Sequence, residues 1–292
     1  MALSDKVFSG SIAEIYDTFL VPLIFEDYAA DLARRVADVE PAEVLETAAG
    51  TGVVTRALAP LLKKDARYVV TDLNQPMLDR AAARQPADSR IAWQQADALS
   101  LPFTAGRFDA VCCQFGAMFF PDRIAGYREA RRVLKPNGRF LFNVWDRIER
   151  NDFSREMTDA AAAIFPNDPP RFLARTPHGY HDVKAIDADV RKAGFSDVAI
   201  VTLQKTSVAP SARHPAIAYC QGTPLRSEIE ARAADALEMV TDRGAAAIAA
   251  KFGQGPVSGK IQAHIVVVRA WERRARAPAH NRLGRVMHQR WE

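Results

Sequence analysis

The first half of the chain alternates short apolar runs with segments whose apolar residues recur at helical spacing. Each apolar run ends in polar or turn-forming residues, which is typical of buried strands. The runs predict strands at residues 44–46, 67–71, 90–95, 110–114 and 139–145. Strands that alternate with helices in this way predict a mainly parallel, doubly wound α/β sheet.

The second half is less regular. Residues 196–206 and 262–269 predict two further strands that pair with each other. The residues between them would then form an insertion, which could lie over the core as a lid or extend as an oligomer arm. Its predicted pieces are a segment at 215–220, a turn at 221–224 and one long helix at about 225–251.

Residues 8–38 have apolar residues at helical spacing, interrupted at Pro22. Because these helices precede the first strand, they must pack on the sheet or cover the edge at which ligands bind. The division that we expect is a helical cap at 1–40, a core at 41–206 and 261–270, a helical insertion at 207–260 and a basic tail at 271–292.

A glycine turn leads from the first predicted strand into a helix. The segment is Val44-Leu-Glu-Thr-Ala-Ala-Gly-Thr-Gly52, and the apolar residues of the helix face that follows are Val53, Val54, Ala57, Leu58 and Leu61. Glycine allows the backbone to turn sharply and to approach a ligand without an intervening Cβ. Strand, glycine turn and helix together predict a site for a nucleotide-like ligand at the carboxyl ends of the strands.

Acidic residues follow three successive predicted strands, at Glu46, Asp72 and Asp97. In a parallel sheet these strand ends face the same crevice. Asp72 can accept hydrogen bonds from a ribose diol, and Asp97 can meet the exocyclic amine of a purine. Glu46 is expected beneath the glycine turn, near a positively charged end of the ligand. Taken singly, each carboxylate could equally be a helix cap or a surface group.

Composition narrows the class of protein. The 292 residues are 48% hydrophobic and 25% charged, as in one large soluble α/β domain or one domain with an inserted lid. Cys112, Cys113 and Cys220 show neither a disulfide framework nor metal-ligand spacing, so we expect no metal site. No signal-peptide pattern is present and no apolar run approaches about 18 residues, so we expect a cytoplasmic protein without membrane insertion.

The charge is concentrated at the C-terminal end. Between Arg269 and Glu292, seven arginines against two glutamates contribute +5 to a formal net charge of +4. The remainder therefore carries −1, which argues against nucleic acid and for a small molecule as the partner. The tail has the composition of a solvated end, although it could touch an anionic surface.

Five segments in order resemble the motifs of class I S-adenosylmethionine-dependent methyltransferases. They are Val44 to Gly52, Val69-Val-Thr-Asp-Leu73 with Pro76-Met-Leu78, Gln95-Ala-Asp-Ala98 with Leu101-Pro-Phe103, Phe108-Asp-Ala-Val111, and Glu129-Ala-Arg-Arg-Val-Leu-Lys-Pro-Asn-Gly138. The resemblance is specific over residues 40–145 and points to the small-molecule branch that includes the ubiquinone and menaquinone biosynthesis methyltransferases. It implies a Rossmann-like seven-stranded sheet whose last strand is antiparallel.

The same resemblance implies a binding site for S-adenosylmethionine. The turn after the first strand would hold the methionine end, Asp72 the ribose and the segments after the next two strands the adenine. Gln114 would face the sulfonium and the substrate, and Tyr16 resembles a residue that closes over the cofactor. Ala48 stands where the family usually has glycine, so we expect a slightly wider turn. The implied residues are Tyr16, Glu46, Thr47, Ala48, Gly50, Gly52, Asp72, Leu73, Met77, Asp97, Ala98 and Gln114.

Methyl transfer depends largely on alignment and desolvation, but an acidic oxygen or an activated carbon also needs a proton acceptor. The candidates for this catalytic role are Tyr16, His178 and His181. A core tyrosine, and a turn ahead of a helix, account for these residues as well. The residues after Gln114 form an apolar wall that suits either substrate contact or core packing: Phe115, Met118, Phe119 and Phe120.

We therefore expect transfer of a methyl group from S-adenosylmethionine, with S-adenosylhomocysteine as product, to an oxygen, carbon or nitrogen of a small apolar or aromatic metabolite. A homodimer is compatible with this expectation. Two alternatives stay open. One is a nicotinamide-dependent oxidoreductase, which would have no use for Glu46 and Asp97. The other is a catalytically silent paralogue that binds the cofactor, which the lack of an evident base allows.

Overall fold

The structure, a computed structural model, describes residues 14–270. The basic tail expected at 271–292 and the first residues of the expected N-terminal cap lie outside the described residues. Within 14–270, no helix combines the length and the apolar character needed to cross a membrane.

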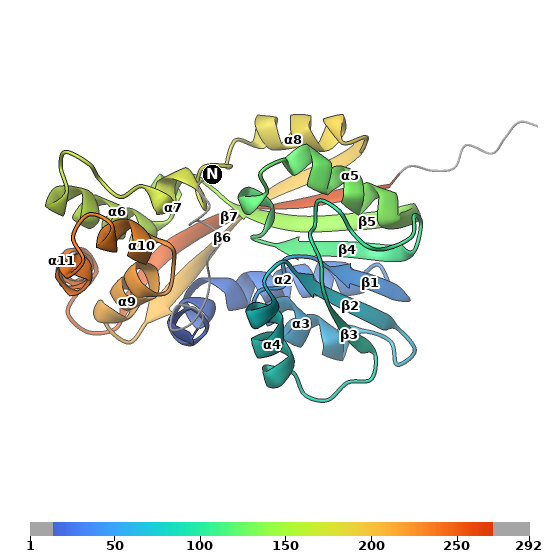
Figure 1. The fold of residues 1–292 in the computed structure, drawn as a ribbon, viewed down its shortest axis with the longest axis horizontal. Coiled ribbons are helices and arrows are strands. Elements are labelled where there is room, and N and C mark those ends of the chain that lie inside the picture. The colour runs from blue at the N-terminus through green and yellow to red at the C-terminus, as the bar shows by residue number, and fades with distance from the viewer. Residues whose placement is uncertain (1–13, 271–292) are drawn as a thin grey trace, which may run out of the picture.

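Seven strands form one sheet: β1 (Glu43–Glu46), β2 (Arg67–Asp72), β3 (Ile91–Gln95), β4 (Phe108–Gln114), β5 (Leu134–Trp145), β6 (Asp197–Ala209) and β7 (Val257–Arg269). Their order is β3-β2-β1-β4-β5-β7-β6 (Figure 1). β1 to β5 are parallel, and β7 runs antiparallel to both β5 and β6. This confirms the doubly wound sheet with an antiparallel last strand. The order reverses between β1 and β4, where open α/β sheets leave a crevice at the carboxyl ends of the strands.

Helices cover both faces of this sheet, because successive side chains of each strand point to opposite faces. In β1, Val44 packs into one buried cluster and Leu45 into another. The first cluster includes apolar residues of α2 (Glu26–Ala37), α3 (Val53–Leu58) and α4 (Gln75–Arg84). The second includes residues of α5 (Arg123–Val133) and α8 (Val183–Lys192). The sheet is therefore the middle one of three layers.

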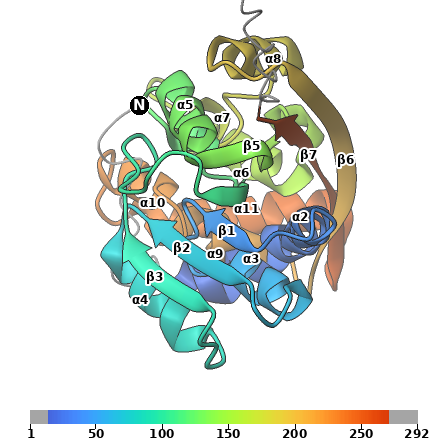
Figure 2. The ribbon, with the colours of Figure 1, turned by 90° about the vertical axis from the view of Figure 1, so that its right-hand side faces the viewer.

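The remaining α-helices gather at one end of the sheet, toward which the long strands β6 and β7 extend (Figures 1 and 2). They are α6 (Asp152–Ile164), α7 (Phe172–Arg175), α9 (Arg213–Gln221), α10 (Leu225–Glu230) and α11 (Ala236–Phe252). β6 and β7 pair from Asp197 with Arg269 to Ala209 with Val257, beyond the ends expected from the sequence.

The single helix expected at 225–251 is wrong. The structure has α10 and α11 there, separated by a turn at 231–235. Arg232 lies in this turn, and its guanidinium donates hydrogen bonds to the carbonyl oxygens of Glu228 at 2.6 Å and Asp168 at 2.5 Å. These bonds satisfy the end of α10 and tie it to the loop before α7. A partner so distant in sequence leaves no local signal.

The interruption expected at Pro22 is also wrong. The chain is helical without a break from residue 14 to Ala37, with a π-helical segment, η2 (Tyr16–Phe25), that continues into α2. Pro22 lies inside η2, where the wider hydrogen-bond spacing tolerates its missing N–H. η2 packs against both α2 and α9, so the N-terminal helix joins the two ends of the molecule.

Two further local expectations differ from the structure. Residues 135–138, whose sequence Lys-Pro-Asn-Gly is typical of a turn, lie inside β5 at a bulge, where the pairing with β4 shifts between Phe108–Leu134 and Ala110–Arg139. Leu61, expected on a buried helix face, is 48% exposed. It is exposed because α3 ends at Leu58 and continues only as a short 3₁₀ turn, η3 (Ala59–Leu61).

Candidate active site

A cavity lies at the carboxyl ends of the central strands, at the point where the strand order reverses. Its lining comes from the loop after β1, the segments after β2, β3 and β4, and the end of β5. η2 contributes from the N-terminal side, and α6, α7 and α9 contribute from the second half of the chain. Segments far apart in sequence therefore share one site.

The loop after β1 turns through three left-handed residues. Ala48 has φ 53°, Gly50 has φ 56° and Gly52 has φ 78°. Ala48 thus adopts the conformation that usually favours glycine. Its methyl group has room because residue 116 is also glycine: a Cβ added to Gly116 would lie only 2.5 Å from the Cβ of Ala48. The loop therefore keeps a tight left-handed turn, but position 116 cannot carry a side chain while residue 48 is alanine.

Asp72 holds this loop from the end of β2. Its carboxylate accepts hydrogen bonds from the Gly50 N–H and from the Asn74 N–H, each at 2.8 Å. Burial raises the pKa of Asp72, and these backbone N–H groups oppose the rise because they favour the carboxylate. Asp72, Gly50 and Asn74 all line the cavity, so the loop and the carboxylate are presented together.

Glu46 does not line the cavity. Its Oε2 accepts hydrogen bonds from the Thr55 hydroxyl at 2.7 Å and from the Tyr68 hydroxyl, beneath the loop. Burial raises the pKa of Glu46 to about 7, and the two hydroxyl donors oppose this rise. Thr47 and Gly52 also stay outside the lining. These residues support the loop from behind.

The segments after β2 and β3 form one end of the cavity. Leu73 and Met77 offer apolar surface there, and Asp97 and Ala98 also belong to the lining. Leu73 is 44% exposed, which is unusual for a leucine beside a buried strand end and leaves an apolar face ready for a flat ligand. Asp97 accepts a hydrogen bond from the Leu99 N–H at 2.9 Å, which orients its carboxylate.

η2 forms a second wall of the cavity, with Tyr16 among its lining residues. Burial, together with the nearby carboxylates of Asp72 and Asp17, raises the pKa of Tyr16 well above its ordinary value, so its hydroxyl stays neutral. Asp17 is buried and forms ion pairs with Arg80, at 2.8 Å, and Arg84 of α4. These pairs fasten η2 to the helix that carries Met77.

The end of β4 leads into the aromatic part of the cavity. Gln114 donates to the carbonyl oxygen of Phe25 at 3.3 Å and accepts from the Asn143 amide at 3.4 Å. Phe115 follows with φ 49°, and its ring stacks on Trp145 with centroids 3.9 Å apart and planes 7° from parallel. Among the residues expected as an apolar wall, Phe115, Phe119 and Phe120 line the cavity, whereas Met118 is buried outside it: its place is in the core.

The far end of the cavity was not expected from the sequence. It is lined by Trp145 and Ile261 of the sheet, Asn151 and Ser154 at the start of α6, Phe172 and Leu173 of α7, Pro177 and His178 of the following loop, and Tyr219 and Thr223 around α9. These residues come from six separate segments. The only signal for them in the sequence was the pair of histidines near residue 180.

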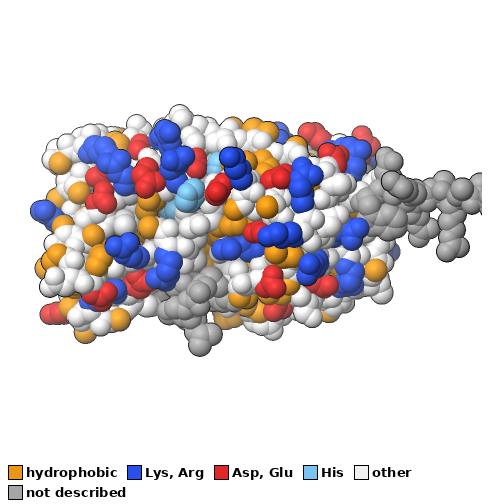
Figure 3. All heavy atoms as spheres, turned by 90° about the horizontal axis from the view of Figure 1, so that it is seen from above, with side chains coloured by type: hydrophobic (Ala, Val, Ile, Leu, Met, Phe, Trp, Pro, Cys, Tyr) orange, Lys and Arg blue, Asp and Glu red, His pale blue; other side chains and the backbone are white. Residues whose placement is uncertain are grey.

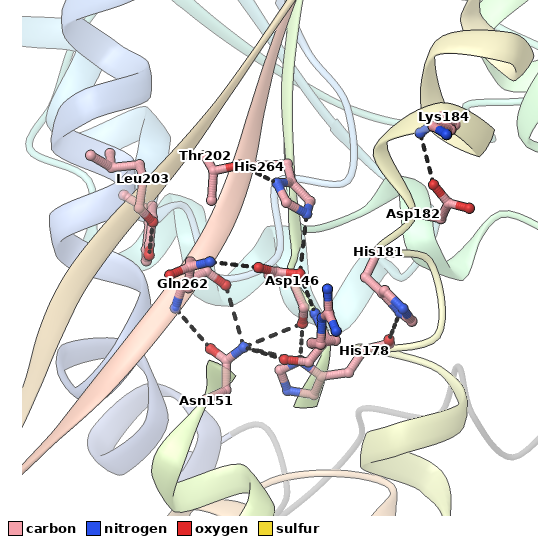
Figure 4. A network of polar contacts seen from close by, with 12 residues as sticks. Asp146, Asn151, His178, His181, Asp182, Lys184, Thr202, Leu203, Gln262 and His264 are labelled. Atoms are coloured by element: carbon pink, nitrogen blue, oxygen red, sulfur yellow. Dashed lines mark hydrogen bonds and ion pairs between the residues drawn. The ribbon is translucent and has the colours of Figure 1, made fainter. Parts of the chain in front are cut away.

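His178 is the one member of that pair that lines the cavity. Its Nδ1 lies 2.8 Å from the carbonyl oxygen of Asp146, in a polar network that also includes Asn151 and Gln262 (Figure 4). His181 lies outside the lining, and its Nδ1 is 2.8 Å from the carbonyl oxygen of His178. Of the catalytic candidates, the structure brings Tyr16 and His178 to the cavity.

Residues 45–142 match the model of a family described as a methyltransferase domain. The chain is 34% identical to the demethylmenaquinone methyltransferase of Thermus thermophilus, over 64% of this chain and 90% of that one. It is 30% identical to the demethylmenaquinone methyltransferase of Clavibacter sepedonicus, over 63% of this chain and 80% of that one. The chain belongs to the class I S-adenosylmethionine-dependent methyltransferases.

Solved structures agree with the fold of this methyltransferase. It superposes on the YcgJ protein of Bacillus subtilis with a TM-score of 0.55 and 19% identity, over 84% of this chain and 99% of that one. It superposes on a phosphoethanolamine N-methyltransferase of Haemonchus contortus, solved with S-adenosylhomocysteine, with a TM-score of 0.59 and 13% identity, over 92% and 60% of the two chains. At these identities the likeness concerns the fold alone.

The methyltransferase uses S-adenosylmethionine to methylate a small apolar metabolite. The comparisons do not favour the two alternatives, a nicotinamide-dependent oxidoreductase and a catalytically silent paralogue. This agrees with the cavity, which pairs a polar end near Asp72 with a long apolar end.

The residues present fit this cofactor. A Cβ on Gly50 would meet only Met77, at 4.0 Å, so there is open space between this loop and α4. The Thr51 hydroxyl in the same loop has no hydrogen-bond partner among residues 14–270. Carboxylates at Asp72 and Asp97 suit a ribose diol and an exocyclic amine.

Proposed function

We propose that the acceptor is an electron-rich aromatic ring that carries a hydroxyl group, as in a hydroquinone. The supporting observation is that one cavity joins the polar end near Asp72 to an aromatic end at Trp145 and Phe172. The cofactor supplies an electrophilic methyl group, so the acceptor must offer an electron pair. A quinone ring is poor in electrons, whereas its reduced dihydroxy form is rich in them. The relatives of Thermus thermophilus and Clavibacter sepedonicus are named for demethylmenaquinone.

We also propose how the chain holds the cofactor. The loop from Ala48 to Thr51 would bind the methionine end, with Glu46 supporting it from beneath, and Asp72 would accept hydrogen bonds from the ribose. Leu73 and Met77 would cover the adenine, with Asp97 and Ala98 at its edge. Tyr16 would close the site, and Gln114 would lie near the reacting methyl group. All of these residues except Glu46 line the cavity, and the hydrogen bonds of Glu46 to Thr55 and Tyr68 beneath the loop support its placement.

The aromatic end would align the acceptor and keep water away. The stacked pair of Phe115 and Trp145 is buried and leaves little space for solvent at the end of β4. Alignment and exclusion of water are the two contributions that methyl transfer needs most from a protein.

We infer that the N-terminal helix and the α9–α11 insertion cover the acceptor end as a lid, consistent with the domain division expected from the sequence. Tyr219 and Thr223 of this insertion line the cavity, which supports the lid. The face in Figure 3 intersperses Lys and Arg with Asp and Glu, which suits a small-molecule enzyme better than a nucleic-acid surface. Self-association as a dimer and a cytoplasmic location stay predictions; light scattering and cell fractionation test them.

Asp72→Ala tests the cofactor site. We expect the affinity for S-adenosylhomocysteine to fall more than tenfold, because a charged hydrogen-bond acceptor is lost and the Gly50 N–H loses its partner. Isothermal titration calorimetry measures the change. Asp79→Ala is the matched control, since Asp79 is an exposed residue of α4 outside the lining. Equal affinities of the Asp72 variant and the wild type would contradict the assignment.

A small acceptor series tests the substrate class. We expect the wild-type enzyme with S-adenosylmethionine to methylate reduced naphthohydroquinone under anaerobic conditions, as detected by mass spectrometry. Oxidised naphthoquinone and the dimethoxy derivative should not react, because the first is electron-poor and the second has no proton to lose. An enzyme that binds S-adenosylhomocysteine yet methylates no hydroxylated aromatic compound would exclude the proposed acceptor class.

A further inference from the structure

A hydroxylated acceptor has to lose a proton, so the following inference rests on the proposed function. We infer that His178 takes this proton on Nε2, and that the carbonyl group of Asp146 holds the imidazole in the tautomer that leaves Nε2 free. His178 lies in the loop between α7 and α8, is 4% exposed and lines the aromatic end of the cavity.

The hydrogen bond at Nδ1 decides the tautomer. A carbonyl oxygen can only accept, so Nδ1 at 2.8 Å from the Asp146 oxygen must carry the hydrogen. The Asn151 amide nitrogen lies 3.5 Å from the same Nδ1, but it already donates to the carbonyl oxygens of Asp146, Arg147 and Gln262. In the neutral ring Nε2 is therefore a free acceptor.

The network in Figure 4 holds the Asp146 carbonyl in place. The Asp146 N–H donates to the carbonyl oxygen of Gln262 in β7 at 3.0 Å, and the Gln262 amide donates to the Asp146 carboxylate at 2.6 Å. Asn151 accepts from the Gln262 N–H at 3.0 Å, and His264 Nε2 lies 3.3 Å from the Asp146 carboxylate. The imidazole of His178 is thus anchored to the sheet rather than to a mobile loop.

The ring also lies on the side of the cavity where β4 ends. Its centroid is 6.1 Å from that of Trp145, and Trp145 stacks on Phe115, the residue after Gln114. An acceptor ring held in this aromatic end would present its hydroxyl to His178 and its reacting atom toward the end of β4.

The step itself is a proton transfer. The O–H bond of the acceptor breaks, an N–H bond forms at Nε2, and the electron pair stays on the oxygen, from which the aromatic ring can share it with a carbon. His178 becomes an imidazolium, stabilised by the Asp146 carbonyl at Nδ1 and by the Asp146 carboxylate nearby. Its proton returns to solvent when the product leaves.

The charged and titratable groups around His178 determine its protonation state in the free enzyme. The pKa of His178 is lowered to about 4, mainly by burial and in part by His181, while the hydrogen bond to the Asp146 carbonyl and the carboxylates of Asp146 and Glu149 oppose the change. Burial would raise the pKa of Asp146, but hydrogen bonds from the Arg147 N–H and from Gln262 hold it below its ordinary value. Tyr219, on the α9 side of the cavity, stays neutral because burial raises its pKa to about 12. The free enzyme therefore keeps Nε2 unprotonated throughout the neutral range.

His178→Asn tests this inference most directly, because the asparagine amide can still donate to the Asp146 carbonyl but the proton acceptor Nε2 is removed. With naphthohydroquinone as acceptor, we expect wild-type kcat/KM to stay constant from pH 8 down to about pH 5, and the variant to lose at least about a hundredfold at pH 7. The variant should gain about tenfold per pH unit until the acceptor ionises by itself. A loss with an unchanged pH profile would reduce His178 to a packing role and overturn the inference.

His214→Asn is the matched control, because His214 lies outside the lining and its Nε2 contacts the carbonyl oxygen of Phe19 rather than His178. We expect it to keep the wild-type pH profile. Calorimetry with S-adenosylhomocysteine checks that the His178 variant still folds and binds. Wild-type rates in the His178 variant, or the same loss in the control, would contradict the assignment.

Nitrogen-15 NMR of the histidine ring gives a readout that needs no turnover. In the complex with S-adenosylhomocysteine, we expect His178 to carry its proton on Nδ1 and to remain neutral down to about pH 5. A proton on Nε2 would overturn the inference whatever the acceptor. If instead the tautomer is as expected but the wild type methylates no hydroxylated ring, it is the proposed acceptor class that fails.

Discussion

At position 48 an alanine occupies a backbone conformation that costs an L-residue about 1 to 2 kcal/mol. Its φ is 53°, and its methyl group occupies the space that a side chain on Gly116 would need. The two positions are therefore coupled across the crevice: alanine at 48 requires glycine at 116. Ala48 replaces the glycine that is usual in the family, and its methyl group fits because Gly116 has no side chain.

Ala48→Gly should raise the free energy of unfolding by up to about 1 kcal/mol. Relief of the left-handed alanine exceeds the extra entropy of glycine in the unfolded chain, about 0.5 to 1 kcal/mol. Gly116→Ala alone should be clearly destabilising, and the double variant should recover part of that loss. Urea denaturation measures all three. Strictly additive effects would show that the two positions are independent.

Glu46 should make the stability depend on pH. Its pKa of about 7 in the folded protein lies above its ordinary value of 4.5, so the folded state holds the proton more tightly than the unfolded state. This contribution is complete below about pH 4.5 and is lost as the pH rises through 7, a loss on the order of 3 kcal/mol. His178 has the opposite effect between about pH 6.5 and 4, because its pKa is lowered.

Glu46→Gln removes the first contribution and leaves the second. Relative to wild type, we expect the variant to gain up to about 3 kcal/mol in the free energy of unfolding between pH 5 and pH 8. Urea titrations of the apo enzyme at the two pH values measure this difference. A difference that does not change with pH would mean that Glu46 is already ionised in the folded protein at pH 5.

Glu46 also shows how a correct motif can mislead about a side chain. Residues alternate along β1, so Glu46 points to the same face as Val44, toward α3 and Tyr68. The motif places Glu46 at the crevice, and the alternation places its carboxylate beneath the loop. Period-two reasoning applied to Val44, Leu45 and Glu46 could have found this from the sequence.

At the scale of elements, η2 is held to α4 by charge. Asp17 is buried between Arg80 and Arg84, which lie one turn apart on α4 and are partly exposed. Because η2 contributes Tyr16 to the cavity and α4 contributes Met77, these ion pairs set the distance between two walls of the cofactor end.

Asp17→Asn should loosen η2 without unfolding the sheet. We expect faster amide hydrogen exchange across residues 16–25 and a roughly threefold to tenfold weaker affinity for S-adenosylhomocysteine, because a charged hydrogen bond is replaced by a neutral one. Asp31→Asn breaks the Asp31–Arg35 pair on α2 and serves as the control. Unchanged exchange in η2 would show that apolar packing alone holds it.

Elements that depend on local apolar periodicity could be predicted from the sequence, but the residues at which they end often could not. The strands of the parallel sheet follow from apolar periodicity and turn residues. The break between α10 and α11 depends on Arg232 reaching Asp168, and the bulge in β5 depends on pairing with β4. Both involve partners outside the local window, so propensity alone cannot place them.

At the scale of the molecule, the cavity joins two bodies that the chain builds separately. The sheet contributes the cofactor end, and α6, α7, α9 and the loop that holds His178 contribute the acceptor end. η2 packs on α9, so the N-terminal helix bridges the two. Tyr28 of α2 ties the same N-terminal segment to β6 of the sheet, with its hydroxyl donating to the Leu203 carbonyl at 2.9 Å.

If the insertion is a lid, the cofactor product should stabilise the cofactor end first, and an aromatic ligand should then stabilise the acceptor end. We expect S-adenosylhomocysteine alone to slow hydrogen exchange in the loop after β1 and in η2. Adding the unreactive dimethoxy analogue of naphthohydroquinone should then slow exchange in α9 and α10 as well. Hydrogen-exchange mass spectrometry measures both steps. If the aromatic ligand does not change the exchange rates of α9 and α10, the insertion would be an oligomer arm rather than a lid.

The sequence by itself determined the sheet, the glycine loop and the acidic residues after its strands, because these depend on local periodicity, backbone requirements and motifs close together in the chain. Tertiary structure alone decided that Ala48 fits against Gly116, that Glu46 supports the loop from beneath and that His178 meets Asp146 beside Trp145. Each of these contacts joins residues far apart in the chain, and their meeting depends on how the second half folds back over the sheet.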